Sequence, residues 1–348
     1  MIKRKKTKQI FVGSVPIGGN APIAVQSMCN TPTWDVKKTV NQIKELEAAG
    51  CEIIRVAVPD KKSADALKEI KQNISIPLIA DIHFDYRLAL ASIENGVDAL
   101  RINPGNIGKE DFIRQVVEAA RKKHIPIRIG VNSGSLEKEF SHLEKVDAMV
   151  ASAMKNVEIL EKYDFDMIKI SLKASDVLTT IEAYEKISEK TDYPLHVGIT
   201  EAGTLKSGLI KSSIGIGAIL LKGIGDTIRV SLTAQPKEEV FAAYELLKSL
   251  KLRNRGVNLI SCPTCGRTKI NLIELAHKVE EIVAPINKPL TIAVMGCPVN
   301  GPGEAKGADI GIAGGIGEGY IFKKGEIIKK VPEQQLLDEF KKELNSMI

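Results

Sequence analysis

Aromatic residues and long apolar runs are both scarce in this 348-residue chain. Aromatic residues make up only 4% of it, which argues against a surface that stacks nucleic-acid bases. No run of about 18 apolar residues occurs, so no segment is an obvious membrane span. The first residues also lack the apolar stretch and the cleavage site of a signal peptide, and we therefore expect a cytoplasmic protein. Neither a nucleic acid nor a membrane is an expected partner.

Cysteine is also sparse, and its distribution is uneven. Five cysteines, three of them grouped late, do not form the disulfide framework of a small secreted domain. The late group consists of Cys262, Cys265 and Cys297. In a reducing compartment such a group indicates metal binding or catalysis.

The net charge of +6 is modest and spread through the chain, which suits an anionic metabolite as ligand. Positive charge is concentrated only at the start of the chain, which we interpret as a solvated terminus. This basic start comprises Lys3, Arg4, Lys5, Lys6 and Lys8.

Short apolar segments that end in polar residues recur through the first part of the chain. There are eight: 23–30, 51–58, 77–84, 99–106, 126–133, 167–174, 195–203 and 227–234. Segments with helical periodicity separate them. Eight strand–helix units are typical of an α/β protein with a closed (β/α)8 barrel of the TIM type. A doubly wound open sheet is the alternative, but it rarely contains eight such regular units.

The pattern changes at the charged segment 251–256, where we place a domain boundary. We expect a barrel domain over 1–252 and a small α+β domain over 253–348. The second domain should contain strands 257–261 and 291–296 and helices 271–283 and 333–344. Two glycine-rich stretches, 214–226 and 313–319, do not fit a dinucleotide-binding fingerprint, so we interpret them as turns and close packing.

Polar residues occupy the late positions of the predicted barrel strands, where active sites of this fold lie. They include Arg55, Asp81, His83, Arg101, Asn103, Arg128, Asn132, Lys169, Ser171, Lys173, His196, Thr200, Glu201, Arg229 and Ser231. Four arginines and a lysine on five strands predict a cationic cup for a phosphorylated or diphosphorylated small molecule. Glu201 is a candidate proton donor or hydroxyl-binding group, or else a partner for an arginine. The two histidines either line the site or pack beside it.

Three thiolates can bind zinc, copper(I) or an iron-sulfur cluster. Zinc needs a fourth ligand, for which His277, Cys29, Cys51 or a carboxylate are the candidates. In a cluster held by three cysteines, one iron keeps a position for a weaker ligand or for substrate. Cys297 precedes a proline, as is common in cluster-binding sequences, and the turn formed by 301–303 could bring the carboxylate of Glu304 to that iron. The alternative is a phosphosugar-binding barrel with a zinc-stabilised C-terminal module.

Longer motifs carry a resemblance to a known family over nearly the whole chain. They are PIAVQSM, IPLIADIHFDYR, LRINPGNIG, IRIGVNSGSL, LHVGITEAG, GIGDTIRVSL, RGVNLISCPTCGR and GCPVNGPGEA. With these motifs the chain resembles the bacterial 4-hydroxy-3-methylbut-2-enyl diphosphate synthases of the non-mevalonate isoprenoid pathway. It differs at Cys29, where the family usually has threonine.

The resemblance implies a barrel followed by an iron-sulfur domain, with a 4Fe-4S cluster held by Cys262, Cys265, Cys297 and Glu304. The implied reaction is the reductive ring opening and dehydroxylation of 2-C-methyl-D-erythritol 2,4-cyclodiphosphate. Flavodoxin or ferredoxin would supply two electrons, one at a time. Glu201 would lie nearest the proton chemistry. The residues implied in binding the diphosphate and hydroxyls are Arg55, Arg101, Asn103, Arg128, Asn132, Lys173, Thr200, Arg229 and Ser231.

The predicted topology also implies a second chain. The last barrel helix, over 237–252, should run about 24 Å away from the mouth of the barrel. The next six residues reach at most about 21 Å, so the second domain would cover its own barrel only under strain. We therefore expect a head-to-tail homodimer in which each cluster domain closes the other chain's barrel. The known arrangement of the family agrees.

Overall fold

The computed structural model describes residues 2–297 and 305–348. The chain forms two compact units, residues 1–253 and 254–348, which are described separately below. Within the described ranges, no helix combines the length and the apolar character needed to cross a membrane.

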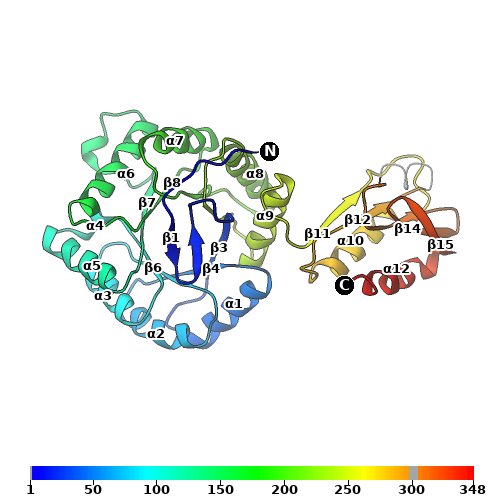
Figure 1. Cartoon of the computed structure of the whole chain (residues 1–348), viewed down its shortest axis with the longest axis horizontal. Helices are drawn as coiled ribbons and strands as arrows, with labels where there is room; N and C mark the ends of the chain where they lie inside the picture. Colours follow the sequence, from blue (N-terminus) through cyan, green and yellow to red (C-terminus); the bar gives the residue numbers. More distant parts are fainter. Residues whose placement is uncertain (1, 298–304) are drawn as a thin grey trace. The chain divides into compact units, whose positions relative to one another are not determined.

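The first unit is a barrel of eight parallel strands, as predicted (Figure 1). The strands are β3 (Ala24–Met28), β4 (Ile53–Ala57), β5 (Leu78–Asp81), β6 (Ala99–Ile102), β7 (Ile127–Asn132), β8 (Ile168–Lys173), β9 (His196–Val197) and β10 (Thr227–Ile228). They pair in chain order from β3 to β8, and β10 lies between β3 and β9. A parallel bridge between Ile170 and Leu195 joins β8 to the start of β9 and closes the barrel.

Helices surround the barrel, and several begin at an aspartate. They are α1 (Val36–Ala48), α2 (Lys61–Gln72), α3 (Tyr86–Glu94), α4 (Pro104–Ile107), α5 (Glu110–Lys122), α6 (Lys145–Glu161), α7 (Val177–Lys190), α8 (Leu205–Leu221) and α9 (Pro236–Ser249). A turn of 3-10 helix, Lys138–Phe140, precedes α6. The N-caps of α1, α2, α3 and α7 accept a backbone N–H of the first turn. These caps are Asp35, Asp60, Asp85 and Asp176.

The stretch 214–226 was wrongly interpreted as turns, because most of it belongs to α8. Close packing explains its glycines in part. A Cβ at Gly215 would lie 2.5 Å from the side chain of Ile199, so glycine lets α8 approach the segment after β9.

A β-hairpin that the sequence analysis missed covers the amino ends of the barrel strands. It consists of β1 (Ile10–Val12) and β2 (Val15–Ile17). Its apolar side chains form a cluster with residues near the starts of β3 to β6. This cluster contains Ile10, Val12, Ile17, Ala24, Ile53, Ile79 and Ala99. The hairpin therefore closes the end of the barrel opposite to the mouth.

The prediction of a solvated basic start is wrong in part: Lys3, Lys6 and Lys8 have exposed side chains, but the backbone of this segment and the side chain of Arg4 are bound to the barrel. The Lys5 N–H donates to the Gly223 carbonyl at 2.9 Å, and the Lys8 N–H donates to the Asp192 carbonyl at 2.7 Å. Arg4 forms an ion pair with the buried Asp226 at 3.1 Å. The reason is long-range: these partners lie about 180 to 220 residues away in the sequence, so no local pattern could reveal them.

The second unit is a five-stranded sheet with two helices. The strands, in sheet order, are β11 (Val257–Ser261), β12 (Leu290–Met295), β13 (Ile310–Gly314), β14 (Glu318–Lys323) and β15 (Glu326–Pro332). β11 to β13 are parallel to one another, whereas β14 and β15 are antiparallel to their neighbours. Helices α10 (Leu272–Val283) and α12 (Leu336–Asn345) pack on the sheet, and a turn of 3-10 helix, Glu333–Gln335, precedes α12.

The prediction of turns and close packing for 313–319 is correct only in part, because the stretch also contains the end of β13 and the start of β14, with the turn between them. Gly314 and Gly319 lie in these strands and make room for neighbouring side chains. A Cβ at Gly319 would lie 2.6 Å from the side chain of Leu336, which belongs to α12. The strand pattern was hidden because the large residues that fill this space come from other elements.

Asp226 tests the contribution of the N-terminal segment to stability. Its carboxylate accepts hydrogen bonds from Arg4, from the Thr7 hydroxyl at 3.0 Å and from the Leu195 N–H at 2.9 Å. Asp226→Ala leaves these buried donors unpaired and should lower the free energy of unfolding by about 3 kcal/mol in urea denaturation. Asp192→Ala removes an exposed partner of Lys5 and should cost less than about 1 kcal/mol. Equal costs for the two variants would contradict this role.

Candidate active site

Basic side chains from five strands converge inside the barrel. Lys173 and Arg229 stand at or just after the carboxyl ends of their strands, whereas Arg128 is the second residue of β7. Arg55, Arg101, Arg128 and Lys173 are all buried, and Arg229 is nearly so. They come from β4, β6, β7, β8 and the residue after β10. Because side chains alternate along a strand, each occupies an inward-facing position of its strand. The predicted cationic cup is therefore assembled from five strands.

Asp81 holds two of these arginines. Its carboxylate lies 3.2 Å from Nη1 of Arg101 and 3.6 Å from Nε of Arg55. Burial alone would raise the pKa of Asp81, but Arg55, Arg101 and the nearby Arg128 outweigh burial and lower it. Asp81 is therefore an ionised carboxylate that fixes the guanidinium groups.

A glycine gives Arg101 its space. Nη2 of Arg101 donates to the Gly130 carbonyl at 2.8 Å, and the Gly130 N–H donates to Oδ1 of Asn103 at 2.8 Å. A Cβ at position 130 would collide with the guanidinium of Arg101. Since Oδ1 of Asn103 is occupied, its amide N–H groups remain the part that can donate to a ligand.

Arg229 is held by Glu239, a buried residue of α9 that the sequence analysis did not single out. Nε and Nη2 of Arg229 lie 3.2 Å and 3.3 Å from the two carboxylate oxygens, a bidentate pair. Glu239 also accepts the Leu232 N–H at 3.0 Å. The sequence does contain a feature that could have identified Glu239. It is an acidic residue on the buried face of an amphipathic helix, and a buried carboxylate normally has a partner inside the fold.

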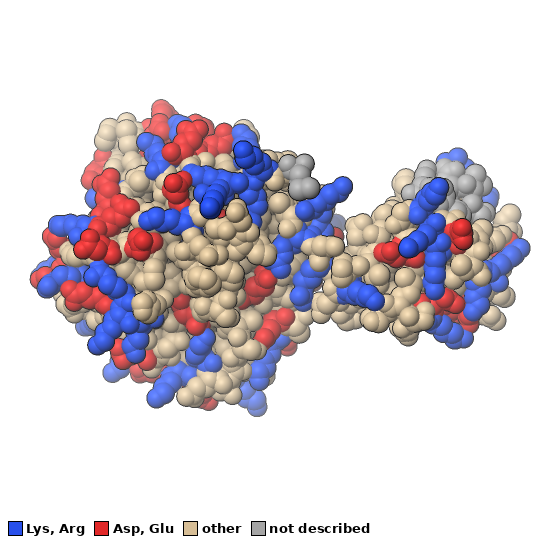
Figure 2. Space-filling model, viewed as in Figure 1, with Lys and Arg blue, Asp and Glu red and all other residues tan. Residues whose placement is uncertain are grey.

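Arg128 and Lys173 form no ion pair with any carboxylate of the described residues. Arg128 has a weak hydrogen bond to Oε1 of Gln26 at 3.5 Å. Burial, together with the neighbouring cations, holds the pKa of Lys173 and that of Arg128 well below their ordinary values. Both side chains would be stabilised in their charged forms by an anion in the cup. Figure 2 shows that acidic and basic side chains are mixed over the visible face of the barrel unit.

The other predicted residues lie less deep. Asn132, Thr200 and Ser231 are half-buried, whereas His83 and Glu201 are exposed. Glu201 has a φ of +53°, which is uncommon for a residue with a Cβ and often marks a functional position. His196 and Lys169 are fully buried in the barrel interior, and Ser171 is buried beside them on β8.

The cysteines lie at one edge of the C-terminal sheet. Cys262 follows β11 and Cys297 follows β12 by two residues, and these neighbouring parallel strands end at the same edge. The Gly296 N–H donates to Sγ of Cys262 at 3.2 Å, and the Cys265 N–H donates to Oγ1 of Thr268 at 3.2 Å. N–H groups directed at sulfur suit a cluster-binding thiolate, because they stabilise its negative charge.

Two of the three thiols follow neighbouring strands at this edge, but the described residues do not form a complete metal site. Within the ranges 2–297 and 305–348, no three His, Cys, Asp or Glu residues are grouped closely enough to hold a metal ion. The predicted fourth ligand, Glu304, lies outside the described residues. Of the other candidates, His277 is exposed on α10, and burial raises the pKa of Cys29 and of Cys51 to about 12 in the barrel core. Both thiols are buried in the core of the first unit.

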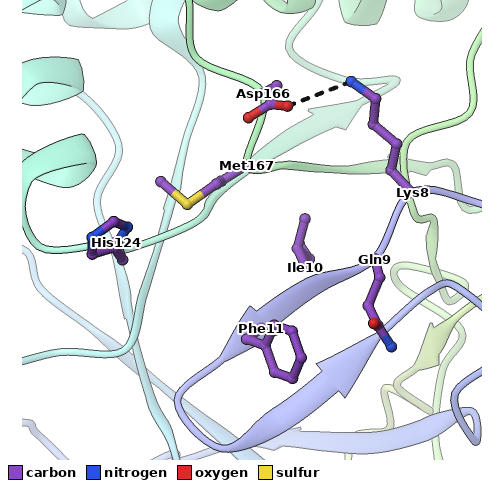
Figure 3. Close-up of a pocket in the computed structure, with 7 residues that line it drawn as sticks. All are labelled: Lys8, Gln9, Ile10, Phe11, His124, Asp166 and Met167. Carbon is purple, nitrogen blue, oxygen red and sulfur yellow. Dashed lines mark ion pairs between the residues drawn. The ribbon is translucent and has the colours of Figure 1, made fainter.

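A hollow of about 450 Å³ lies at the other end of the barrel (Figure 3). It is lined by Lys8, Gln9, Ile10, Phe11, His124, Asp166 and Met167. These residues lie in β1 or shortly before β1, β7 or β8, so the hollow is at the amino ends of the barrel strands. Its one ion pair, between Lys8 and Asp166 at 3.6 Å, is exposed, and none of the buried cations lines it. The cup, and not this hollow, is the candidate active site.

Two family models match the chain. The GcpE TIM-barrel domain matches residues 7–244, and the GcpE protein C-terminal domain matches residues 258–346. The curated relatives are named 4-hydroxy-3-methylbut-2-en-1-yl diphosphate synthase (flavodoxin). The one from Caldanaerobacter subterraneus is 63% identical over 100% of this chain and 99% of its own length. The one from Dehalococcoides mccartyi is 57% identical over 100% of both chains.

Among solved structures, two dihydropteroate synthases resemble the barrel. The enzyme from Stenotrophomonas maltophilia gives a TM-score of 0.53 at 14% identity, over 70% of this chain and 97% of its own. The enzyme from Yersinia pestis gives a TM-score of 0.52 at 12% identity, over 70% of this chain and 98% of its own. At such low identity the likeness concerns the fold alone.

The role of Asp81 predicts a pH-dependent cost of substitution. Because its pKa is lowered in the fold, ionised Asp81 contributes stability above the unfolded value of about 3.9, and this contribution is lost as the pH falls through the lower folded pKa. Asp81→Asn should therefore lower the free energy of unfolding by about 3 kcal/mol at pH 7, and the difference from wild type should shrink below about pH 4. Asp85→Asn, at an exposed ion pair with Arg87, should cost less than about 1 kcal/mol. A cost for Asp81→Asn that does not change with pH would contradict the ion-pair role.

Proposed function

Because the chain belongs to the GcpE family, we propose that it is an oxidoreductase that converts 2-C-methyl-D-erythritol 2,4-cyclodiphosphate into 4-hydroxy-3-methylbut-2-enyl diphosphate. The conversion opens the ring and removes a hydroxyl with two electrons. The names of the relatives, at 57–63% identity over both units, support this activity and a flavodoxin as electron donor. A ferredoxin, which also transfers electrons one at a time but from an iron-sulfur cluster, is the other candidate donor.

The observation that carries the proposal is the unbalanced charge inside the barrel. Five cations, Arg55, Arg101, Arg128, Lys173 and Arg229, face two carboxylates there, those of Asp81 and Glu239. A cyclic diphosphate carries one negative charge on each phosphorus and would neutralise much of the excess. Guanidinium groups that are already fixed bind phosphate oxygens without a large loss of side-chain freedom.

We assign the roles by position. The five cations would bind the diphosphate oxygens, and Asp81 and Glu239 would position Arg55, Arg101 and Arg229. Asn103, Asn132, Thr200 and Ser231 would donate to the substrate oxygens, and His83 would line the rim. Glu201, at the end of β9, would exchange the proton that the loss of the hydroxyl requires.

Cys262, Cys265 and Cys297, with Glu304 as the fourth ligand, would hold a 4Fe-4S cluster. Their place at one sheet edge and the N–H donor at Sγ of Cys262 support this set. When bound, the cluster would supply electrons one at a time and a Lewis-acidic iron. A zinc site would need a fourth ligand, and Cys29 and Cys51 are buried in the core of the first unit.

The exit of the chain from the barrel supports the head-to-tail dimer. Nη1 of Arg253 donates to the Ile23 carbonyl at 2.7 Å, and Nη2 donates to Glu52 at 2.9 Å. Both partners directly precede a barrel strand, so the chain leaves at the amino ends. The residues before Val257 span at most about 14 Å, less than the roughly 20 Å rise of a six-residue strand. We propose that the C-terminal unit of a second copy closes each mouth.

An exposed apolar stripe on α8 is where we place the contact between the two barrels. Ile210, Ile214 and Leu221 are 63%, 56% and 59% exposed and share one side of the helix. The exposed polar residues of α8 all lie in its first half, Lys206, Ser207, Lys211 and Ser213, whereas its second half is apolar. If the two-fold axis is perpendicular to α8, a contact of this stripe with itself makes the barrels antiparallel, so that each mouth lies beside the chain exit of its partner.

Removal of a cluster ligand separates the two metal hypotheses. Anaerobically prepared wild type should be brown and contain about four irons. Cys262→Ala should lose iron and activity together, whereas Cys51→Ala, in the barrel core, should retain both. Iron content and the visible spectrum make the measurement. A colourless wild type with one zinc, or an active iron-free Cys262→Ala, would contradict the cluster.

Mixed dimers test the sharing of active sites. Cys297→Ser and Arg128→Ala are each expected to be inactive, but refolded mixtures should regain roughly a quarter of wild-type activity, because half of the dimers are mixed and each contains one intact site. Adding Ile214→Glu to both chains should abolish the rescue and give monomers in analytical ultracentrifugation. Ile273→Glu, at a residue 61% exposed on α10, is the control and should allow the rescue. No activity in the plain mixture would refute the shared site.

A further inference from the structure

Below the cationic cup lies a buried lysine that the proposed reaction does not use. Lys169 is 1% exposed, and among the described residues its Nζ has no hydrogen-bond partner. It stands on β8 four residues before Lys173, so both side chains are on the inner face of the strand. A buried ammonium group without a partner is costly, and an unpartnered group of this kind needs an explanation.

The neighbours of Lys169 place its side chain near the barrel axis. It interacts electrostatically with Arg128 on the adjacent β7, with Asp226 at the start of β10, and with Arg55 on β4. In the closed order of eight strands, β4 is four strands away from β8 and therefore opposite to it. An interaction across the barrel is possible only if Nζ points inward. Arg55 and Arg128 belong to the cup, so Lys169 forms part of its floor.

The other groups near Lys169 do not neutralise the positive charge at the floor of the cup. His196 on β9 is buried with Nδ1 at 2.8 Å from Oγ1 of Thr227, and burial and the cations lower its pKa well below the ordinary value, so it is neutral. Arg229 adds positive charge above. Burial and the neighbouring cations also lower the pKa of Lys173, so an anion in the cup would favour the charged form of Lys173 too, and the substitutions of Lys169 below separate the two lysines. Asp226 is the nearest carboxylate, and Arg4 already pairs with it. Burial, followed by Arg128, lowers the pKa of Lys169 to about 7.

We propose that Lys169 takes up a proton from solvent when an anionic substrate enters the cup, so that binding of the cyclic diphosphate is coupled to protonation of this residue. The inference rests on the proposed function, since it requires an anion in the cup. The Nζ lone pair accepts the proton and becomes an ammonium group beneath the substrate. An anion close to Nζ in a low-dielectric interior favours the charged form, and the charged form in turn strengthens binding of the anion.

Because ligand binding and protonation of Lys169 are thermodynamically linked, the direction in which the dissociation constant changes with pH follows from the protonation state of the free barrel. At pH 6 Lys169 is already protonated in the free barrel, so binding takes up little there. At pH 8 it is mostly neutral, and binding must first add the proton. The dissociation constant should therefore rise by up to about tenfold per pH unit above pH 7. The ligand does not contribute, because each phosphorus of the cyclic diphosphate carries a single, strongly acidic hydroxyl.

The test is calorimetric titration of the full-length chain with 2-C-methyl-D-erythritol 2,4-cyclodiphosphate, without reductant, at pH 8. Titrations in two buffers of different ionisation enthalpy count the protons taken up per ligand bound. Two variants remove the titration at position 169, because a methionine side chain is never charged and an arginine side chain always is. Lys169→Met and Lys169→Arg should therefore both take up about one proton fewer than wild type on binding. Lys122→Met, at an exposed lysine of α5, is the matched control and should take up as many as wild type.

The two Lys169 variants also separate a protonation role from a structural one. Above pH 7, Lys169→Arg should bind with less pH dependence than wild type, and Lys169→Met should bind more weakly at pH 6. If circular dichroism shows that Lys169→Met does not fold, the number of protons that Lys169→Arg takes up per ligand bound decides between the two roles. Wild-type binding without proton uptake, or an unchanged count in the folded variants, would overturn the inference. Absence of wild-type binding at every pH would instead contradict the proposed function.

Discussion

Buried positive charge that the protein does not fully neutralise is the constraint on which the barrel depends. Cations inside a low-dielectric interior are unfavourable unless each has a partner. Asp81 and Glu239 supply partners for three arginines, and Gly130 supplies space for one of them. Arg128 and Lys173 receive no described carboxylate, which leaves a net attraction for an anion. Burial, together with the neighbouring cations, lowers the pKa of Lys169 and of Lys173, and this would link anion binding to proton uptake.

Glycine has a structural role in this arrangement at two positions on the inner face. A Cβ at Gly198 would lie 3.0 Å from Nζ of Lys173 and 2.6 Å from the Arg229 carbonyl. At Gly130, a Cβ would displace Arg101. Other barrels fill such positions with branched apolar side chains. Here the space is taken by long basic side chains that reach in from neighbouring strands, so the core and the ligand site are built from the same residues.

Much of the barrel and its cup could be predicted from the sequence, because the signals are local. Eight apolar segments ending in polar residues identify the strands, and alternation identifies Arg55, Arg101 and Arg128 as inward-facing. Glu239 was not foreseen as the partner of Arg229, because that pairing depends on how α9 packs against the barrel, although the two residues are close in the sequence. The N-terminal segment was not foreseen because Arg4 meets Asp226 far along the chain. The strands around Gly314 and Gly319 were missed because side chains of Ile270 and Leu336 fill the space that larger residues would otherwise occupy.

The cysteine site also has one part that the sequence predicts and another that only the fold reveals. Spacing predicted the three thiols, and strand register explains why two of them end at one edge of the sheet. The donor at Sγ of Cys262 depends on the position of Gly296 in the fold, which no spacing reveals. Glu304 lies outside the described residues, so its assignment rests on the family resemblance and on the turn that precedes it in the sequence.

The most direct test of the central claim, that the barrel interior needs an anion, is differential scanning calorimetry of the full-length chain with and without the cyclic diphosphate. At a ligand concentration 100 times the dissociation constant, the free energy of unfolding should rise by about 2.7 kcal/mol, and the midpoint temperature should rise with it. The uncharged polyol methylerythritol at the same concentration should have no effect. Equal midpoints with and without the diphosphate, up to the solubility of the ligand, would contradict the account.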